Sequence, residues 1–256
     1  MVLKARKIKG YGWKPDLPDH RDHLYTAPTG ILASLPTSID LRSQCPPVYD
    51  QGQLGSCTGN SIAGGIEFDL RKQNKQDFVP SRLFIYYNER AIEGTIDNDS
   101  GAQIRDGIKS VANLGVCPEN EWPYNINEFT NKPSQKCFDD ALKTKAESYS
   151  RVIRTLNQMK GCLASGYPFV FGFTVYESFE SQEVARTGVV PIPSADEQVL
   201  GGHAVLAVGY DDSQSRFIVR NSWGDSWGMK GYFTMPYSYL LDENLSDDFW
   251  TIRIVG

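Results

Sequence analysis

Residues 51–57 read Gln51-Gly52-Gln53-Leu54-Gly55-Ser56-Cys57, a turn rich in glycine that leads into a helical pattern. Apolar residues then recur at helical spacing, at positions Ile62, Ala63, Ile66 and Leu70. The pattern predicts a helix from about Ser56, with the Ser56 side chain as its N-cap. Unpaired N–H groups and the helix dipole make that end positive, which favours the thiolate of Cys57. The same N–H groups can hold an oxyanion.

A reactive cysteine needs a base, and the chain offers only three histidines, His20, His23 and His203. The first two lie in a polar segment. His203 follows Gly201-Gly202 and opens an apolar run, so it is expected at the end of a strand that faces a cleft. A lone histidine in such a place is ordinarily structural, but here a candidate nucleophile lacks a partner. We therefore assign His203 as the base.

An imidazole also needs an acceptor that fixes its tautomer, and Asn221 is placed to be one. Residues 203–210 and 216–221 read as two strands joined by a polar hairpin at 211–215. In an antiparallel pair the end of one strand lies beside the start of the other, which brings Asn221 to His203. Trp223 follows closely, and an indole there would keep water from the Asn–His contact.

The remaining pattern predicts helices in the first half of the domain and strands in the second. Helices are expected at 81–92, 103–112, 139–146 and 155–164, the first of them capped by Ser81. Strands are expected at 169–175, 203–210, 216–221, 232–235 and 249–254. This order predicts an α+β fold of two sub-domains, one helical and one built on a β-sheet or barrel, facing each other across a cleft.

Composition excludes several classes of function. The chain has 256 residues, 40% of them hydrophobic, and a formal net charge of −5. An acidic balance gives no electrostatic reason to bind nucleic acid or an anionic membrane. The longest apolar run, Ala204–Val208, is far shorter than a membrane span and reads as a strand. No signal peptide is recognisable at the N-terminus, which favours an intracellular protein. Nothing in the sequence predicts a metal site or a cofactor.

Five cysteines leave at least one thiol unpaired. If Cys57 is that thiol, three pairings of the others are open, and so is the alternative that all are reduced and buried. The other four are Cys45, Cys117, Cys137 and Cys162.

Three segments together resemble the active-site segments of the papain family of cysteine peptidases. They are Gln51–Cys57, Gly202-His203-Ala204 and Asn221-Ser222-Trp223-Gly224, in the family's order. His203 follows Cys57 by 146 positions (203 − 57), a separation typical of these enzymes. The resemblance covers the chain from about residue 35 to its end. It implies hydrolysis of peptide bonds in peptide or protein substrates through an acyl-enzyme, with endopeptidase action by default. It also implies protein inhibitors as binding partners.

The resemblance also implies individual roles. Gln51 would donate its side-chain amide to the oxyanion hole together with the Cys57 N–H, and Trp223 would shield the Asn221–His203 contact. Ser100-Gly101 would bind the substrate backbone. The walls of the pocket for the side chain preceding the scissile residue would include Ala102, Gln103, Gly172 and Ala204. The acidic residues Asp242, Glu243, Asp247 and Asp248 are expected near its floor, so a bulky apolar side chain or an arginine should fit.

The chain departs from the family at several positions. Leu54 stands where a disulfide-bonded cysteine is usual, Thr58 where tryptophan follows the nucleophile, and Ser100 where a glycine is usual. Residues 1–34 are too short for the usual helical pro-region. They read as an extended arm that lacks a helical or strand period, yet carry Tyr11, Trp13 and Leu17, which need somewhere to bury. We expect this arm to be a short pro-segment that locks the cleft, or else a strap that joins the sub-domains; residues 35–256 form the domain.

Two other functions remain open at this stage. Cys57, His203 and Asn221 could also catalyse a related acyl transfer, such as deamidation or transamidation, which differs from hydrolysis only in the acceptor. A non-catalytic binding module on the same fold is the third reading. It is disfavoured because the chain keeps Cys57, His203, Asn221 and Gln51 together.

Overall fold

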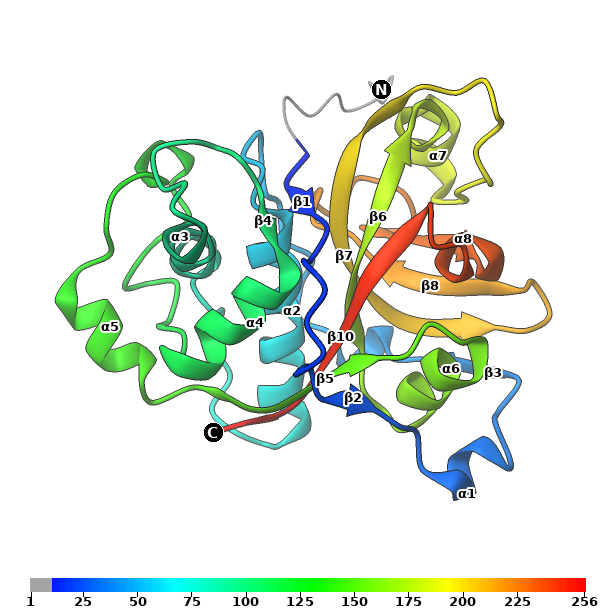
Figure 1. Ribbon diagram of the computed structural model, residues 1–256, viewed down its shortest axis with the longest axis horizontal. Helices are drawn as coiled ribbons and strands as arrows, with labels where there is room; N and C mark the ends of the chain where they lie inside the picture. Colours follow the sequence, from blue (N-terminus) through cyan, green and yellow to red (C-terminus); the bar gives the residue numbers. More distant parts are fainter. Residues whose placement is uncertain (1–10) are drawn as a thin grey trace.

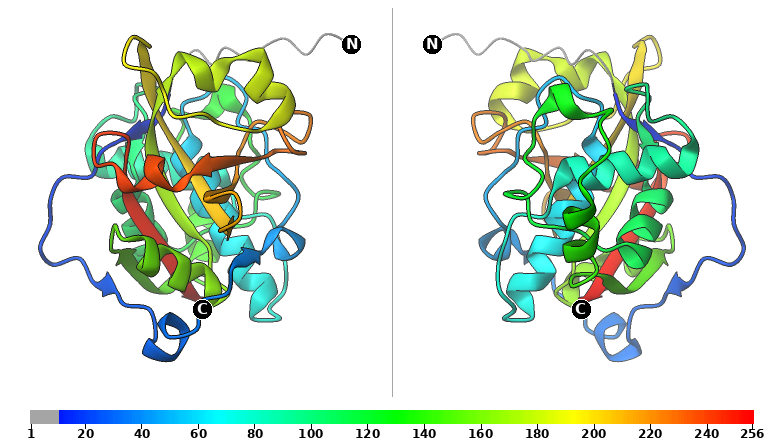
Figure 2. Two further views of the ribbon diagram at one scale, coloured as in Figure 1. Left: turned by 90° about the vertical axis from the view of Figure 1, so that its right-hand side faces the viewer. Right: turned by 90° about the vertical axis from the view of Figure 1, so that its left-hand side faces the viewer.

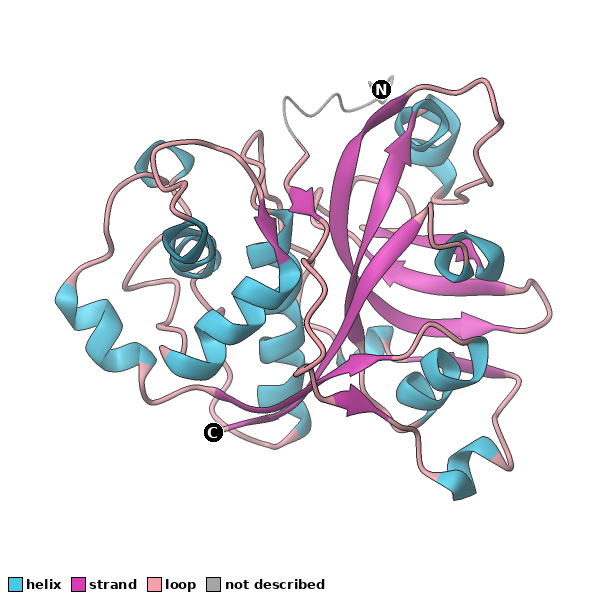
Figure 3. Cartoon of the chain, viewed as in Figure 1, coloured by secondary structure: helices cyan, strands magenta, loops and turns pink. Residues whose placement is uncertain are grey.

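The computed structural model, which describes residues 11–256, has two halves: one is built of helices, and the other is a large β-sheet with further short helices around it (Figures 1 and 3). The helices are α1 (Thr29–Leu32), α2 (Cys57–Lys72), α3 (Arg82–Glu93), α4 (Ile104–Asn113), α5 (Gln135–Ala141), α6 (Leu156–Ala164), α7 (Gln182–Thr187) and α8 (Tyr237–Leu241). The strands are β1 (Trp13–Lys14), β2 (Leu24–Tyr25), β3 (Ser38–Asp40), β4 (Ala102–Gln103), β5 (Ala146–Val152), β6 (Phe169–Tyr176), β7 (Val199–Asp211), β8 (Arg216–Arg220), β9 (Tyr232–Pro236) and β10 (Ser246–Val255). The predicted α+β class is confirmed.

Helix α2 is the central element of the helical half and packs against both α3 and α4. All its residues from Cys57 to Leu70 are buried, so its apolar positions serve the core on every side. Ser81 caps α3 as predicted, its hydroxyl accepting the Phe84 N–H. The predicted cap at Ser56 is wrong: the Ser56 side chain makes no cap bond and instead pairs with the Tyr124 hydroxyl at 2.5 Å.

The other half is an eight-stranded sheet with the order β2-β5-β10-β6-β7-β8-β9, with β3 pairing to β7. Strand β7 carries the apolar run 204–208 and runs antiparallel to both β6 and β8. Its hairpin with β8 was predicted, but β7 begins four residues earlier than expected, at Val199. The two glycines before His203 therefore lie within the strand, paired with Thr174 and Val175 of β6.

Strand β5 and the position of α5 were not predicted. β5 pairs with β10 although only Ala146 and Val152 in it are buried, so its sequence lacks an alternating apolar face. Helix α5 lies four residues before the expected span, because Ser134 caps it through the Cys137 N–H. The prediction of a helix over 139–146 is wrong beyond Ala141, where a turn at 142–144 leads into β5.

The arm crosses the front of the molecule between the two halves (Figures 1 and 2). The sequence predicted an arm without regular structure, but the arm contains two short strands and helix α1. β1 pairs in parallel with β4 of the helical half, and β2 pairs in parallel with β5 of the sheet. The expectations for residues 1–10 lie outside the described residues.

The five cysteines are buried free thiols, so none of the disulfide pairings is formed. Within residues 11–256, no helix has both the length and the apolar character needed to cross a bilayer.

Candidate active site

Cys57 is the first residue of α2 and is fully buried. Its sulfur accepts the backbone N–H of Ala204 at 3.3 Å, which ties the start of α2 to strand β7. The N–H groups of Thr58 and of Gly12 in the arm also point to the sulfur. The thiol thus lies at the seam between the two halves, surrounded by donors.

His203 and Asn221 meet at this seam. His203 Nε2 lies 2.8 Å from Asn221 Oδ1, and both side chains are buried. Asn221 Oδ1 also accepts the N–H of Ser222 at 2.9 Å, which fixes the amide. His203 Nδ1 has no hydrogen-bond partner among the described residues, which leaves this nitrogen free to exchange a proton.

An aromatic cage encloses the imidazole. The Trp223 indole stacks on it with ring centroids 5.1 Å apart and an interplanar angle of 29°. Phe173 and Phe179 contact it edge-on or tilted at 5.7 and 6.3 Å. Such a cage excludes water from the His203–Asn221 hydrogen bond, and hydrogen bonds are stronger in a low dielectric.

Gln51, six positions before Cys57, is 1% exposed. The Ser222 hydroxyl donates to Gln51 Oε1 at 2.6 Å, and Gln51 Nε2 donates to the Leu54 carbonyl at 3.0 Å. These two bonds fix the orientation of the amide. An amide nitrogen carries two N–H groups, so one donor of Nε2 is left for another acceptor.

The ionisation of the pair differs from the expectation for an open helix terminus. Burial raises the pKa of Cys57 to about 12 in spite of the surrounding N–H groups. Burial also lowers the pKa of His203 to about 4, although the hydrogen bond to Asn221 acts in the opposite direction. Burial thus disfavours the charged forms of both groups. The pKa of Cys57 is therefore raised and not lowered as expected, because burial outweighs the N–H donors around the sulfur.

The expected backbone-binding segment lies on the helical side of Cys57. Gly101 has a φ of 69° and its N–H donates to the Tyr86 hydroxyl at 3.1 Å, while Ser100 Oγ donates to Thr95 Oγ1 at 3.0 Å. The Ala102 N–H donates to the Gly12 carbonyl at 2.7 Å. Ala102 thus pairs with a peptide backbone, and the peptide is the chain's own arm.

Trp13 fills the place predicted as a substrate pocket. Its ring lies directly on Gly172, where an added Cβ would come within 2.0 Å of it, and on Gly202, where the distance would be 2.7 Å. The indole N–H donates to Asp248 Oδ2 at 3.0 Å. Of the four acidic residues expected near the floor, Asp248 contacts the ring. Ala204 is the cross-strand partner of Gly172, and its N–H donates to the thiol of Cys57.

Tyr11 and Gly12 cover the reactive groups. The Tyr11 ring meets the imidazole of His203 edge-on with centroids 6.1 Å apart, and its hydroxyl donates to Glu180. Gly12 passes so close to Gly55 that an added Cβ would lie 1.6 Å from the Gly55 carbonyl oxygen. The roles of Gly12, Phe179 and Glu180 were not predicted from the sequence. The aromatic residues of the arm were the only indication that it packs against the domain.

No group of three or more His, Cys, Asp or Glu side chains within residues 11–256 is arranged to hold a metal ion. The chemistry of the site rests on the thiol, the imidazole and the amides that surround them.

The family model described as papain family cysteine protease matches residues 35–242. The chain belongs to the papain family. It is a cysteine-type peptidase, a hydrolase that acts on peptide or protein substrates. The matched range begins at the predicted boundary between the arm and the domain.

Relatives of this papain-family peptidase cover most of its length. The solved structure of xylellain, a cysteine protease from Xylella fastidiosa, is 48% identical with a TM-score of 0.91 and covers 100% of both chains. A peptidase C1-like protein of Acanthamoeba polyphaga mimivirus is 43% identical over 96% of this chain and 88% of its own. Digestive cysteine proteinase 1 of Homarus americanus is 30% identical over 78% of this chain, which spans 61% of that relative.

Proposed function

We propose that this papain-family peptidase is an endopeptidase in which Cys57 is the nucleophile, His203 the general base and acid, and Asn221 the residue that orients the base. The observation that carries the assignment is the 2.8 Å contact of His203 with Asn221 beside a cysteine at the start of a buried helix. No other cysteine among the five has both features.

The reaction follows from these positions. His203 takes the proton of Cys57, and the sulfur attacks the scissile carbonyl carbon. The resulting oxyanion lies at the N-terminus of α2, where the Cys57 N–H and the second N–H of the Gln51 amide can donate to it. His203 then protonates the leaving amine, and an acyl-enzyme remains. Water, deprotonated by His203, attacks this thioester, and the carboxylic acid product leaves with Cys57 restored.

The substrate backbone is proposed to bind along Ser100, Gly101 and Ala102, where the arm now forms its hydrogen bond. The side chain preceding the scissile residue would take the place of Trp13 on Gly172. This place supports two preferences. A bulky apolar side chain buries area as the indole does. Arginine can donate to Asp248 as the indole N–H does.

We further propose that residues 11–14 lock the cleft. The support is that Gly12 presents its N–H group to the sulfur of Cys57. A donor offers the nucleophile nothing to attack, so the arm would occupy the site without being cut there. Residues 13–14 of the arm also pair in parallel with residues 102–103, and this pairing holds the arm in the cleft. Protein inhibitors that enter the same cleft would compete with these residues.

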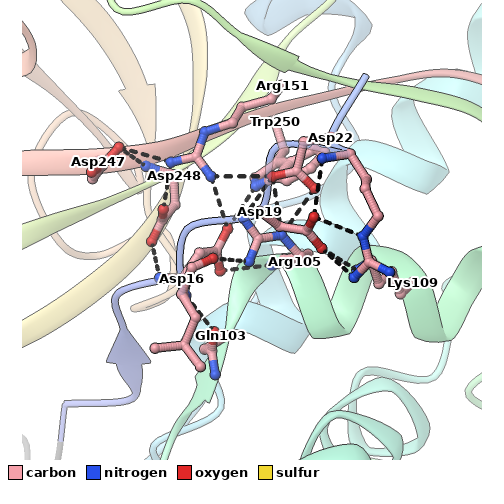
Figure 4. A network of polar contacts seen from close by, with 12 residues as sticks. Asp16, Asp19, Asp22, Gln103, Arg105, Lys109, Arg151, Asp247, Asp248 and Trp250 are labelled. Atoms are coloured by element: carbon pink, nitrogen blue, oxygen red, sulfur yellow. Dashed lines mark hydrogen bonds and ion pairs between the residues drawn. The ribbon is translucent and has the colours of Figure 1, made fainter. Parts of the chain in front are cut away.

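The rest of the arm, residues 16–34, is proposed to act as the strap. Figure 4 shows Asp16, Asp19 and Asp22 reaching Arg105 and Lys109 of α4 and Arg151 of β5. The Arg105–Asp22 pair is 2.6 Å long and both side chains are 6% exposed. Buried pairs of this kind hold their partners firmly once formed, since breaking one leaves an uncompensated charge.

A thiol-reactive peptidyl inhibitor tests the catalytic assignment. The full chain should be labelled at Cys57 and lose peptidase activity in step, and Cys57→Ala should be neither labelled nor active. Cys45→Ala is the matched control, because Cys45 is also buried near the same helix, and it should react like the unaltered chain. Labelling of Cys57→Ala at an equal rate would overturn the assignment. Amide transfer without hydrolysis would favour the acyl-transfer alternative.

A further inference from the structure

Glu89 of α3 is a buried acid directly behind the nucleophile. It is 0% exposed, and its Oε2 accepts the hydroxyl of Thr58 at 2.7 Å. Thr58 is the residue after Cys57 in the first turn of α2 and is itself fully buried. A carboxyl group thus reaches the start of the catalytic helix through a single hydrogen bond.

The second oxygen of Glu89, Oε1, makes no hydrogen bond within residues 11–256. Gly107 of α4 leaves the space for it, since a Cβ there would lie 2.2 Å from Oε1. A carboxylate that is ionised and half-satisfied in a dry site is costly, whereas a protonated one is far less so.

Within residues 11–256, no cationic side chain forms an ion pair with Glu89. Arg90, its neighbour on α3, donates to the carbonyls of Tyr86, Ile96 and Phe129. Glu93 of α3 and Asp106 of α4 are acidic and disfavour a further negative charge, and from α2 the facing groups are Thr58 and Cys57. Burial, Glu93 and Asp106 therefore favour the uncharged form of Glu89, and only the Thr58 hydrogen bond and the charge of Arg90 oppose them.

We infer that Glu89 is a positioning residue that holds the first turn of α2 through Thr58, and that it does so as an uncharged acid. This inference rests on the proposed roles of Cys57 and His203. The turn it holds carries the Cys57 N–H that is proposed to bind the oxyanion. It also explains why threonine serves at a position where the family usually has tryptophan: the hydroxyl is the link to α3.

The pKa of Glu89 is raised, which favours the uncharged acid. Burial raises its pKa to about 8, with Thr58 and Arg90 acting against the shift and Glu93 and Asp106 adding to it. A negative charge on Glu89 in turn raises the pKa of Cys57. Below about pH 8 Glu89 is protonated, so the Cys57 thiolate forms without a second negative charge buried nearby. As the pH rises through that value, Glu89 ionises and thiolate formation becomes harder.

The experiment compares pH profiles of peptide hydrolysis for the full chain with Glu89 unaltered and with Glu89→Gln, a neutral group of the same shape. Both are measured with the arm as it is and with Gly12→Ala, which displaces the arm from the cleft by its clash with Gly55. The ratio of kcat/KM, Glu89→Gln over unaltered, should be near one at pH 6.5 and rise to about 10 at pH 9, because about a tenth of Glu89 stays protonated one unit above its pKa.

Thr58→Val supplies a second, isosteric variant. It removes the donor, so kcat should fall about tenfold while KM stays within about twofold, as for a group that positions the transition-state donors. A kcat/KM ratio that stays constant from pH 6.5 to 9, or an unchanged kcat in Thr58→Val, would show that Glu89 only fills space and overturn the inference. Loss of all hydrolysis at every pH in chains that keep Glu89 would instead count against the proposed peptidase assignment.

Discussion

At the scale of single residues, the site is organised by amides more than by charges. Asn221 fixes the imidazole, and Gln51 is fixed in turn by Ser222 and Leu54. Amides carry donors and acceptors without the desolvation cost of an ion, so they can be buried next to a thiol. Their geometry can therefore be complete before any charge develops in the reaction.

Gln51→Ala tests this organisation. Turnover should fall by about 10²–10³, because the lost donor acts on an oxyanion that exists only in the transition state. KM should change little. The measurement is steady-state hydrolysis of one peptide by the full chain. Gln53→Ala is the matched control, two positions away and exposed, and should keep its turnover. Equal turnover in both variants would remove Gln51 from the oxyanion hole.

The residues of the site could be predicted from the sequence because each lies in a local pattern. Cys57 follows a glycine turn, and a polar hairpin aligns His203 with Asn221. The contacts of Tyr11, Gly12 and Trp13 could not be predicted in this way. They join positions separated by up to 235 residues, as in the Trp13–Asp248 hydrogen bond, and no local period encodes such a pairing. Glu89 lies on a helix that was predicted, but its partner Thr58 is on another.

At the scale of elements, the arm divides into two parts with different partners. Residues 11–14 contact the reactive groups, whereas β2 is paired in the main sheet and Tyr25 is buried there. Elements with long apolar patterns, such as α2 and β7, were predicted. Strands of two residues such as β1 and β2 were not, because they gain their hydrogen bonds only from a tertiary partner.

Gly12→Ala should open the lock and leave the strap in place. The added Cβ would lie 1.6 Å from the Gly55 carbonyl oxygen, so residues 11–14 must leave the cleft. A peptidyl inhibitor should then label Cys57 at least about tenfold faster, an effect of about 1.4 kcal/mol on the closed state. The thermal midpoint should change by only a few degrees, since β2 and the Arg105–Asp22 pair remain.

Gly30→Ala is the matched control for this prediction. Gly30 lies in the same arm, in α1, and a Cβ there would have no atom within 4 Å. Its labelling rate should equal that of the unaltered chain. If Gly12→Ala lowers the thermal midpoint and labels no faster, residues 11–14 serve as part of the strap and the lock is excluded.

At the scale of the whole molecule, the arm is joined to both halves by one network of acids and bases (Figure 4). Asp248 of β10 accepts the N–H of Asp16 at 2.7 Å and the Trp13 indole, and Arg151 donates to it at 3.0 Å. Arg151 also faces Asp16 and Asp22, while Arg154 pairs with Asp247. Seating the arm therefore brings the Asp16 and Asp248 carboxyl groups into one buried cluster.

This cluster gives the seated arm a dependence on pH. Burial, with the nearby charge of Asp16, raises the pKa of Asp248 to about 7, and burial raises the pKa of Asp16 as well. Both groups regain solvent when the arm leaves, so their pKa values then fall. A group whose pKa is higher in the seated state takes up a proton on seating. The arm should be held most tightly in acid, and its hold should weaken as the pH rises towards 7.

The Ala102 amide reports this equilibrium without involving the thiol, because it donates to the Gly12 carbonyl. Its hydrogen-exchange protection in the full chain, corrected for the intrinsic rate, should fall about tenfold or more between pH 5 and 7. Asp19, whose pKa its bonds to Arg21 lower, stays ionised over this range and does not oppose the trend. Asp248→Asn keeps an acceptor for Trp13 but cannot titrate, so its protection should vary far less. A protection factor that is constant with pH in the unaltered chain, or equally steep in Asp248→Asn, would show that the arm is held by packing alone.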